Sequence, residues 1–280
     1  MYIATASGKG GTGKTLVSTA LALCAGTCTY VDLDVEEPNG FIFLDPQIEK
    51  ERPYSLPVPV FNESVCAFCE ACSKACAYNA LAVIPALRKV MFFTELCHSC
   101  GVCSYVCPVE GAITETEKEI GKVRSGRAGN VTCIEGRLNV GRPSGVPLIS
   151  GIIQHYLDMK DLLIVDSPPG TSCPVVESIK HSDYVILVTE PTPFGLNDLK
   201  LAAEIVRTMG KNAGIIINKD TGKKTGIEEF SKEAKIPIIS RIPYSVEIQE
   251  AYSRGIPLTE SLPGIKEEFT ALLKTITGKK

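Results

Sequence analysis

The chain has 280 residues, enough for one large hydrophobic core or two smaller ones, and 44% of them are hydrophobic, as in an ordinary soluble domain. The formal net charge of −3 gives no general attraction to nucleic acid or to an anionic membrane. No apolar run reaches the roughly 18 residues of a spanning helix, and the first motif lies too close to Met1 for a signal peptide. We therefore expect a cytoplasmic protein with no nucleic-acid partner and no stable membrane insertion.

A glycine-rich loop follows the short apolar stretch at residues 2–6. Residues 7–15 read SGKGGTGKT and match G-x-x-x-x-G-K-[ST], a loop whose backbone N–H groups cradle phosphate oxygens. Lys14 is placed to reach the β- and γ-phosphates, and the Thr15 hydroxyl is placed to bind Mg²⁺. The helix predicted over residues 16–23 adds the positive end of its dipole. The residues predicted to bind the nucleotide are Gly8, Gly10, Gly11, Thr12, Gly13, Lys14 and Thr15.

A second lysine, Lys9, follows Gly8 directly. A loop with this extra lysine resembles the deviant Walker A loop of the MinD/ParA/Mrp and nitrogenase iron protein class of ATPases. In that class the extra lysine reaches the nucleotide of the partner subunit. The resemblance therefore implies ATP or ADP, Mg²⁺ and a dimer, formed by two copies of the chain or with a paralogous ATPase. A solvated loop cation is the less favoured alternative for Lys9.

Two predicted strands end in carboxylates, where ligands of open parallel sheets collect. The first spans residues 28–34 and ends in Asp34. The resemblance covers residues 31–39 and implies that Asp34 orients the attacking water, although a helix cap or surface turn also fits. The second strand, residues 161–166, ends in Asp166 and is followed by SPPG. It resembles a Walker B and switch II segment, in which Asp166 would hold Mg²⁺ through water.

The remainder of the chain alternates strands and helices. We predict strands at 184–189, 214–220 and 236–240, with helices at 196–209 and 265–276. The fold class is therefore α/β, a P-loop NTPase with a mostly parallel sheet flanked by helices. By resemblance, Asn218 contacts the adenine edge and Pro243 flanks the base. Thr221 stands where the guanine-specific pattern N-K-x-D needs aspartate, so guanine specificity is not supported. MinD proteins use a terminal amphipathic helix to bind membranes. The last helix of this chain is instead expected to pack on the sheet.

Eight of the twelve cysteines lie between residues 66 and 107. Residues 66–76 have the spacing C-x2-C-x2-C-x3-C, and residues 97–107 repeat it with a trailing proline, as in bacterial two-cluster ferredoxins. Each run's fourth cysteine serves the other cluster in that pattern. The expected ligands of two [4Fe-4S] clusters are Cys66, Cys69, Cys72 and Cys107 for the first, and Cys97, Cys100, Cys103 and Cys76 for the second.

Other uses of these cysteines fit less well. Disulfides belong to oxidising compartments, and all-cysteine zinc sites usually pair two cysteines with two. Ala77 follows Cys76 where the ferredoxin pattern has proline, which changes a turn but removes no ligand. His98 lies inside the second run and is interpreted as a tuning or surface residue, because the cysteines supply all the ligands.

The cysteine-rich segment interrupts the predicted ATPase. Residues 45–60 contain four X-Pro steps and predict an extended connection, residues 119–140 predict short strands, and residues 150–159 predict an amphipathic helix. We expect an ATPase domain at 1–60 and 116–280, with a two-cluster ferredoxin-like α+β domain inserted at 61–115.

Four cysteines lie outside the two runs. Cys24 and Cys28 are expected to be buried and inert. Cys173 follows Asp166 by a distance similar to that of a cluster cysteine in the nitrogenase iron protein, whose other ligand lies upstream, as Cys133 does. By that resemblance, Cys133 and Cys173 would hold a third [4Fe-4S] cluster shared across a dimer. The alternative is that both are small packing residues.

Three functions follow. The first is an ATP-hydrolysing protein that couples ATP binding to ferredoxin-type electron transfer with a redox partner. The second is an iron–sulfur cluster carrier of the Mrp kind, although the C-x-x-C pair used by such carriers does not occur after Cys107. The third is a positioning ATPase of the MinD/ParA kind, in which eight ferredoxin-type cysteines have no evident use.

Overall fold

The structure, a computed structural model, describes residues 1–157 and 161–278. The chain divides into two compact units. The first unit comprises Met1–Glu51, Val123–Arg137 and Ile149–Lys280, and the second comprises Arg52–Lys122 and Leu138–Leu148. Two long strands, β3 (Gln47–Phe61) and β6 (Ile113–Ala128), continue from one unit into the other. The domain assignment at residues 1–60, 61–115 and 116–280 stays a prediction.

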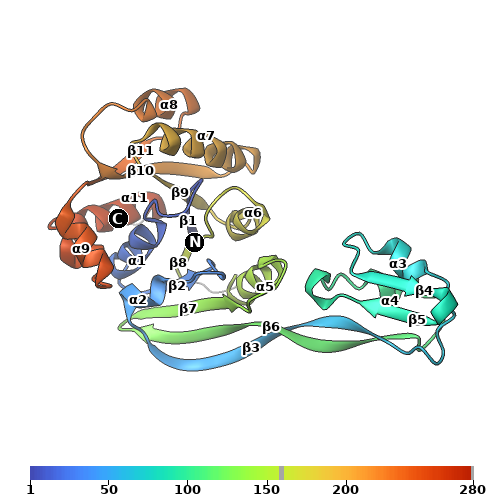
Figure 1. The fold of residues 1–280 in the computed structure, drawn as a ribbon. Helices are drawn as coiled ribbons and strands as arrows, with labels where there is room; N and C mark the ends of the chain where they lie inside the picture. Colours follow the sequence, from blue (N-terminus) through green and yellow to red (C-terminus); the bar gives the residue numbers. More distant parts are fainter. Residues whose placement is uncertain (158–160, 279–280) are drawn as a thin grey trace. The chain divides into compact units, whose positions relative to one another are not determined.

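A sheet of nine strands, in the order β11-β10-β9-β1-β8-β2-β7-β6-β3, is the frame of the first unit (Figure 1). The strands from β11 to β7 in this order pair in parallel. Their bounds are β1 (Tyr2–Ala6), β2 (Cys28–Asp32), β7 (Val131–Leu138), β8 (Leu163–Asp166), β9 (Tyr184–Thr189), β10 (Asn212–Asp220) and β11 (Ile238–Pro243). Parallel strands are covered on both faces, which explains why β1, β2 and β8 read as nearly unbroken apolar runs. The predicted fold class is confirmed for this unit.

Helices cover the sheet and close the core. The helix α1 (Lys14–Cys24) buries Leu16, Val17 and Leu21 against the strands, and α11 (Ile265–Thr277) adds Phe269 and Leu273 to the same core. The C-terminal helix therefore packs on the body of the unit, as predicted. The other helices are α2 (Gly40–Leu44), α5 (Val146–Tyr156), α6 (Cys173–Ile179), α7 (Pro193–Thr208), α8 (Ile227–Ala234), α9 (Val246–Ser253) and α10 (Leu258–Ser261).

Two sequence predictions need correction. Residues 45–60, expected only as an extended connection, largely form the edge strand β3 of the sheet. An edge strand tolerates proline because one side needs no backbone donors, so Pro53, Pro57 and Pro59 do not exclude it. The helix predicted over residues 150–159 begins earlier, at Val146, and the last predicted residues, 158 and 159, lie outside the described residues.

The second unit is small and contains the cysteine runs. It has an antiparallel pair, β4 (Leu81–Ile84) and β5 (Lys89–Phe92), and two short helices, α3 (Ala71–Ala75) and α4 (Val102–Val106). Single 3₁₀ turns, η1 (Pro85–Leu87) and η2 (Thr94–Leu96), flank β5. Its core consists of Cys72, Cys103 and Leu81, with Phe61 and Phe92 packed against them.

Candidate nucleotide site and cysteine cavities

The glycine-rich loop connects β1 to α1 and owes its shape to glycine. Gly11 and Gly13 have φ of 78° and 95°, a conformation that favours glycine. A side chain at Gly13 would collide with the amide of Asn218, and one at Gly8 would collide with the backbone of Asp198. The loop is therefore packed tightly against the neighbouring elements and leaves its open side to a ligand.

Asn218 holds this loop from the end of β10. Its Nδ2 donates to the Thr12 carbonyl at 2.8 Å, and its Oδ1 accepts from the Lys219 N–H at 2.9 Å. Asn218 is buried and also lines the cavity beside the loop. The side chain thus positions the phosphate loop, a role that the sequence did not indicate, and its predicted adenine contact stays a prediction.

A cavity of about 570 Å³ opens beside the loop at the carboxyl ends of the strands. This is where open α/β sheets bind ligands. The structure brings to it most of the residues predicted to bind or act on a nucleotide. The cavity is lined, among others, by Gly10, Gly11, Gly13, Lys14, Thr15, Asp34, Asn218 and Pro243.

Asp166 has the environment expected of a Mg²⁺ ligand. It is fully buried, and its Oδ1 accepts a hydrogen bond from Thr5 Oγ1 at 3.1 Å. Its Oδ2 is buried without a hydrogen-bond partner among the described residues. Burial raises the pKa of Asp166, while Lys14 and the Thr15 hydroxyl oppose the rise. An unpartnered carboxylate oxygen beside Thr15 fits a hard cation such as Mg²⁺, which prefers oxygen ligands.

Asp32, which sequence reasoning passed over, lies opposite Asp166 on the neighbouring strand. Its carboxylate accepts backbone N–H groups of Asp34, Asn39 and Gly40 at 3.0, 3.0 and 2.8 Å. Burial, followed by the charge of Asp166, raises its pKa well above the usual range. Asp32 therefore fixes the turn that carries Asp34 into the cavity. The sequence places two aspartates, Asp32 and Asp34, at the end of this strand, and only Asp34 was predicted to have a role in the site.

Lys9 is held within its own chain. Its Nζ lies 3.2 Å from Glu190 Oε2, and Lys219 Nζ lies 2.5 Å from Glu190 Oε1. Lys219 Nζ also donates to the Gly11 carbonyl at 3.2 Å. Burial alone would raise the pKa of Glu190, but hydrogen bonds from Lys219 and Lys9 lower it, so the carboxylate is ionised. Glu190 and Lys219 were not identified from the sequence.

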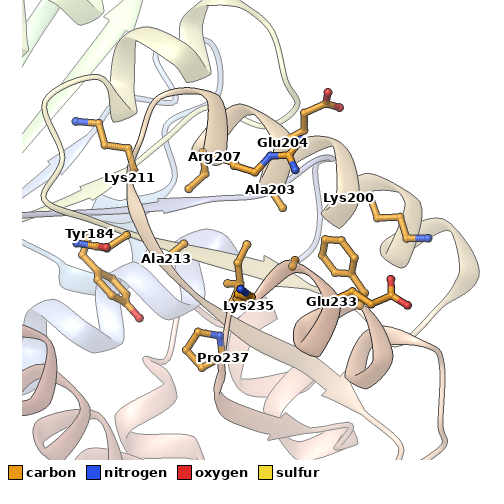
Figure 2. Close-up of a pocket in the computed structure, with 15 residues that line it drawn as sticks. Tyr184, Lys200, Ala203, Glu204, Arg207, Lys211, Ala213, Glu233, Lys235 and Pro237 are labelled. Atoms are coloured by element: carbon orange, nitrogen blue, oxygen red, sulfur yellow. The ribbon is translucent and has the colours of Figure 1, made fainter.

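A larger cavity of about 780 Å³ lies at the amino ends of the strands (Figure 2). It is lined by side chains of α7 and α8 and by the first residues of β9 and β10. Of its cations, Lys211 donates from Nζ to the Ser182 carbonyl, and Lys200 lies over the ring of Phe230, which itself lines the cavity. This position is opposite to the ligand end of the sheet, and we assign it no role.

The predicted cluster ligands surround two small cavities of the second unit. Four cysteines, from both runs, line what we call the first cysteine cavity, and the other four line the second cysteine cavity. The members are Cys66, Cys69, Cys72 and Cys107 in the first, and Cys76, Cys97, Cys100 and Cys103 in the second.

The two runs have the same local backbone. Glu70 and Gly101 both adopt positive φ just before α3 and α4, and Phe68 and Ser99 do so two residues earlier. Corresponding thiols also have the same exposure class in both runs, with the second cysteine exposed and the third buried. The repeat in sequence is therefore a repeat in structure.

These cavities fit a [4Fe-4S] cluster by their donors. Backbone N–H groups of Phe68, Ala80 and Ser99 donate to sulfur atoms of Cys66, Cys76 and Cys97 at 3.3–3.4 Å. Such bonds stabilise thiolate ligands. No group of three or more His, Cys, Asp or Glu in residues 1–157 and 161–278 is arranged around a single metal ion. Each cysteine of a cubane binds a different iron, so its ligands do not converge on one ion.

Cys133 and Cys173 are not brought together as a pair of surface ligands. Cys133 is fully buried in the main core with Tyr30 and Ile164, and burial raises the pKa of its thiol to about 11. Cys173 is exposed at the start of α6. A cluster on a dimer axis needs surface thiols, so Cys133 does not suit the predicted shared cluster. Cys28 is buried as expected, whereas Cys24 is half-buried.

Comparison with known proteins identifies relatives along the whole chain. The family model described as CobQ/CobB/MinD/ParA nucleotide binding domain matches residues 3–258. MJ0579, an uncharacterized protein of Methanocaldococcus jannaschii, is 30% identical over 264 residues, covering 91% of this chain and 90% of that protein. An iron–sulfur cluster carrier protein of Synechocystis is 30% identical over 157 residues, which cover 48% of this chain and 44% of the carrier.

Solved structures share the fold. The septum site-determining protein MinD from Pyrococcus horikoshii, complexed with Mg-ADP, has a TM-score of 0.59 and 18% identity, covering 98% of this chain and 95% of that one. At this identity the likeness concerns the fold alone. Within the described residues, the helices are too short or too polar to cross a membrane.

Proposed function

Because the chain belongs to the CobQ/CobB/MinD/ParA nucleotide-binding family, we propose that it is an ATP-hydrolysing iron–sulfur protein. Its ATPase would act as a dimer and would be coupled to electron transfer through two resident [4Fe-4S] clusters. The observation that carries this proposal is the grouping of eight cysteines around two cavities of one unit, with three from one run and one from the other at each cavity. ATP chemistry would be supported by Lys14 on the phosphates, Thr15 and Asp166 on Mg²⁺, and Asp34 on the attacking water.

The competing candidate is a carrier that delivers clusters to other proteins. The named relatives favour it, because iron–sulfur cluster carrier proteins match about half of this chain. The second unit favours resident clusters instead. Cys72 and Cys103 are part of its small apolar core, so one expected ligand of each cluster is buried where an acceptor protein cannot reach it directly.

Transfer to an acceptor separates the two candidates. The protein is purified without oxygen, loaded with iron and sulfide, and mixed with an apo-ferredoxin, with and without ATP. We expect about 8 iron atoms per chain before mixing, and nearly all of them still bound afterwards. Transfer of most of the iron within minutes would establish the carrier function and contradict resident electron-transfer clusters.

The dimer proposal gives Lys9 two alternative partners. To reach a partner's nucleotide, Lys9 must leave Glu190, which would retain Lys219. We expect Glu190→Gln to free Lys9 and to lower the protein concentration at half-maximal ATPase by up to about fivefold, since a part-exposed ion pair contributes at most about 1 kcal/mol. Lys219→Met should raise that concentration, because Glu190 then pairs with Lys9 alone.

The measurement is ATPase rate against protein concentration, with dimerisation followed by sedimentation. Lys223→Met, a change in the exposed loop after β10, is the control and should leave the midpoint unchanged. The proposed exchange of Lys9 would be contradicted if Glu190→Gln and Lys219→Met moved the midpoint in the same direction.

A further inference from the structure

The two cysteine runs have the same local backbone conformation, but different side chains line their cavities. Residues 66–78 align with residues 97–109 without a gap. In this alignment Ala67 corresponds to His98, and Val109 corresponds to Tyr78. Ala67 and Val109 line the first cysteine cavity, whereas His98 and Tyr78 line the second. One cavity thus has aliphatic walls at the two positions where the other has polar aromatic rings.

The two rings form a defined contact. The His98 and Tyr78 rings are stacked, with centroids 3.7 Å apart and planes 12° from parallel. Tyr78 is 44% exposed, so one side of this stack faces water. The stack joins the residue after Cys97 to the residue two after Cys76, both ligands of the same expected cluster. It therefore places two polar rings at one of the two cavities.

From this asymmetry we infer that the two clusters differ in reduction potential, and that His98 and Tyr78 set the higher potential of the cluster in the second cysteine cavity. The inference rests on the proposed function, because it requires both clusters to be resident. Reduction adds one electron and hence one negative charge to a cluster. Polar rings stabilise that charge better than the aliphatic side chains of Ala67 and Val109 do.

Backbone dipoles act in the same direction. In the second cysteine cavity, the N–H groups of Ala80 and Ser99 donate to Cys76 and Cys97. In the first, the N–H of Phe68 donates to Cys66, but Cys107 Sγ lies 3.5 Å from the Val109 carbonyl oxygen. Donors at sulfur stabilise the reduced cluster, whereas a carbonyl oxygen beside a thiolate opposes added negative charge.

Each cavity also has one carboxylate on its wall. Glu70, at the first, pairs with Lys74 at 2.8 Å, and Glu115, at the second, accepts a hydrogen bond from Ser104 at 3.0 Å. Glu115 is exposed, so water and salt screen its charge. The charge of Glu115 therefore opposes the higher potential of the second cluster only weakly. An electron that leaves the first cluster for the second involves no bond change and no proton.

Redox titration of the cluster-loaded full chain, followed by electron paramagnetic resonance, tests this ordering. All titrations are made at one fixed pH, so that the unmodified protein and the variants are compared under the same conditions. The double variant His98→Ala/Tyr78→Val gives the second cavity the walls of the first. We expect its higher midpoint to fall by roughly 59 mV, a tenfold change in the reduced-to-oxidised ratio for one electron, while the lower midpoint stays.

The chain supplies a matched reverse experiment. Ala67→His/Val109→Tyr gives the first cavity the walls of the second, and we expect the lower midpoint to rise. A Cys69→Ala variant identifies the signals, since it should retain only the higher-potential cluster. Equal midpoints in the unmodified protein, or a double variant that moves neither midpoint, would overturn the inference and leave the proposed function standing. A protein that assembles no clusters would overturn both.

Discussion

Replacement of Asp34 by asparagine is expected to lower the turnover of ATP about 10²–10⁴-fold, the usual contribution of a positioned proton acceptor. Asp34 lines the nucleotide cavity and is held there by the bond from its backbone N–H to Asp32. Asparagine keeps the size of the side chain but cannot accept a proton from water. ATP binding, measured separately with a fluorescent nucleotide, should change little because Lys14 and the phosphate loop remain intact.

Glu37→Gln is the matched control for this variant. Glu37 is an exposed carboxylate on the wall of the same cavity. It shares the charge and neighbourhood of Asp34 but is not held by Asp32, so we expect its loss to change turnover by less than about twofold. If both variants lowered turnover equally, the effect would come from the overall charge of the cavity, and the specific role of Asp34 would be wrong.

The carboxylate of Asp34 also predicts the acid limb of the pH profile of ATP hydrolysis. Burial raises the pKa of Asp34 to about 6, and Lys14 opposes the rise. The acceptor must be ionised, so activity is lost as the pH falls through the pKa. The kcat/KM of ATP hydrolysis, which reports the free enzyme, should therefore decline below about pH 6. A limb near the ordinary carboxyl pKa of about 4 would exclude Asp34 as the titrating group.

The sequence could predict the parts of this site that are formed by residues adjacent in the chain. The phosphate loop needs glycine at particular backbone angles, so its motif is readable from adjacent residues. The partners of Lys9 could not be found this way. Glu190 follows β9 and Lys219 lies in β10, and both come near the loop only because β1, β9 and β10 are neighbours in the sheet. The order of the strands along the chain does not tell which strands are adjacent in the sheet.

Burial was the other property that residue patterns left open. Cys133 and Cys173 fit a resemblance by their distance along the chain, but strand register turns Cys133 toward the core beside Tyr30. The same limit applies to Asp32, whose inward position distinguishes it from Asp34 two residues later. The edge strand β3 was missed because its prolines argue against a central strand, and an edge position cannot be read from composition.

Removal of one exposed cysteine from either cysteine cavity is expected to halve the bound iron. Cys69 and Cys100 occupy equivalent exposed positions in the two runs. We expect Cys69→Ala and Cys100→Ala each to lose about 4 of about 8 iron atoms, with matching acid-labile sulfide, and the double variant to lose nearly all. Cys72 and Cys103 are unsuitable for this test, because their removal would also disturb the core of the second unit.

Cys173→Ala is the control, since this exposed thiol lies in the first unit and outside both cavities. It should keep all of the iron, and a loss would support the predicted cluster on the dimer axis. Additivity is the decisive point, because the two cavities have no cysteine in common. Loss of all iron from either single variant would mean that the clusters assemble as one unit. Bound zinc without acid-labile sulfide would contradict the clusters altogether and leave the ATPase as the remaining activity.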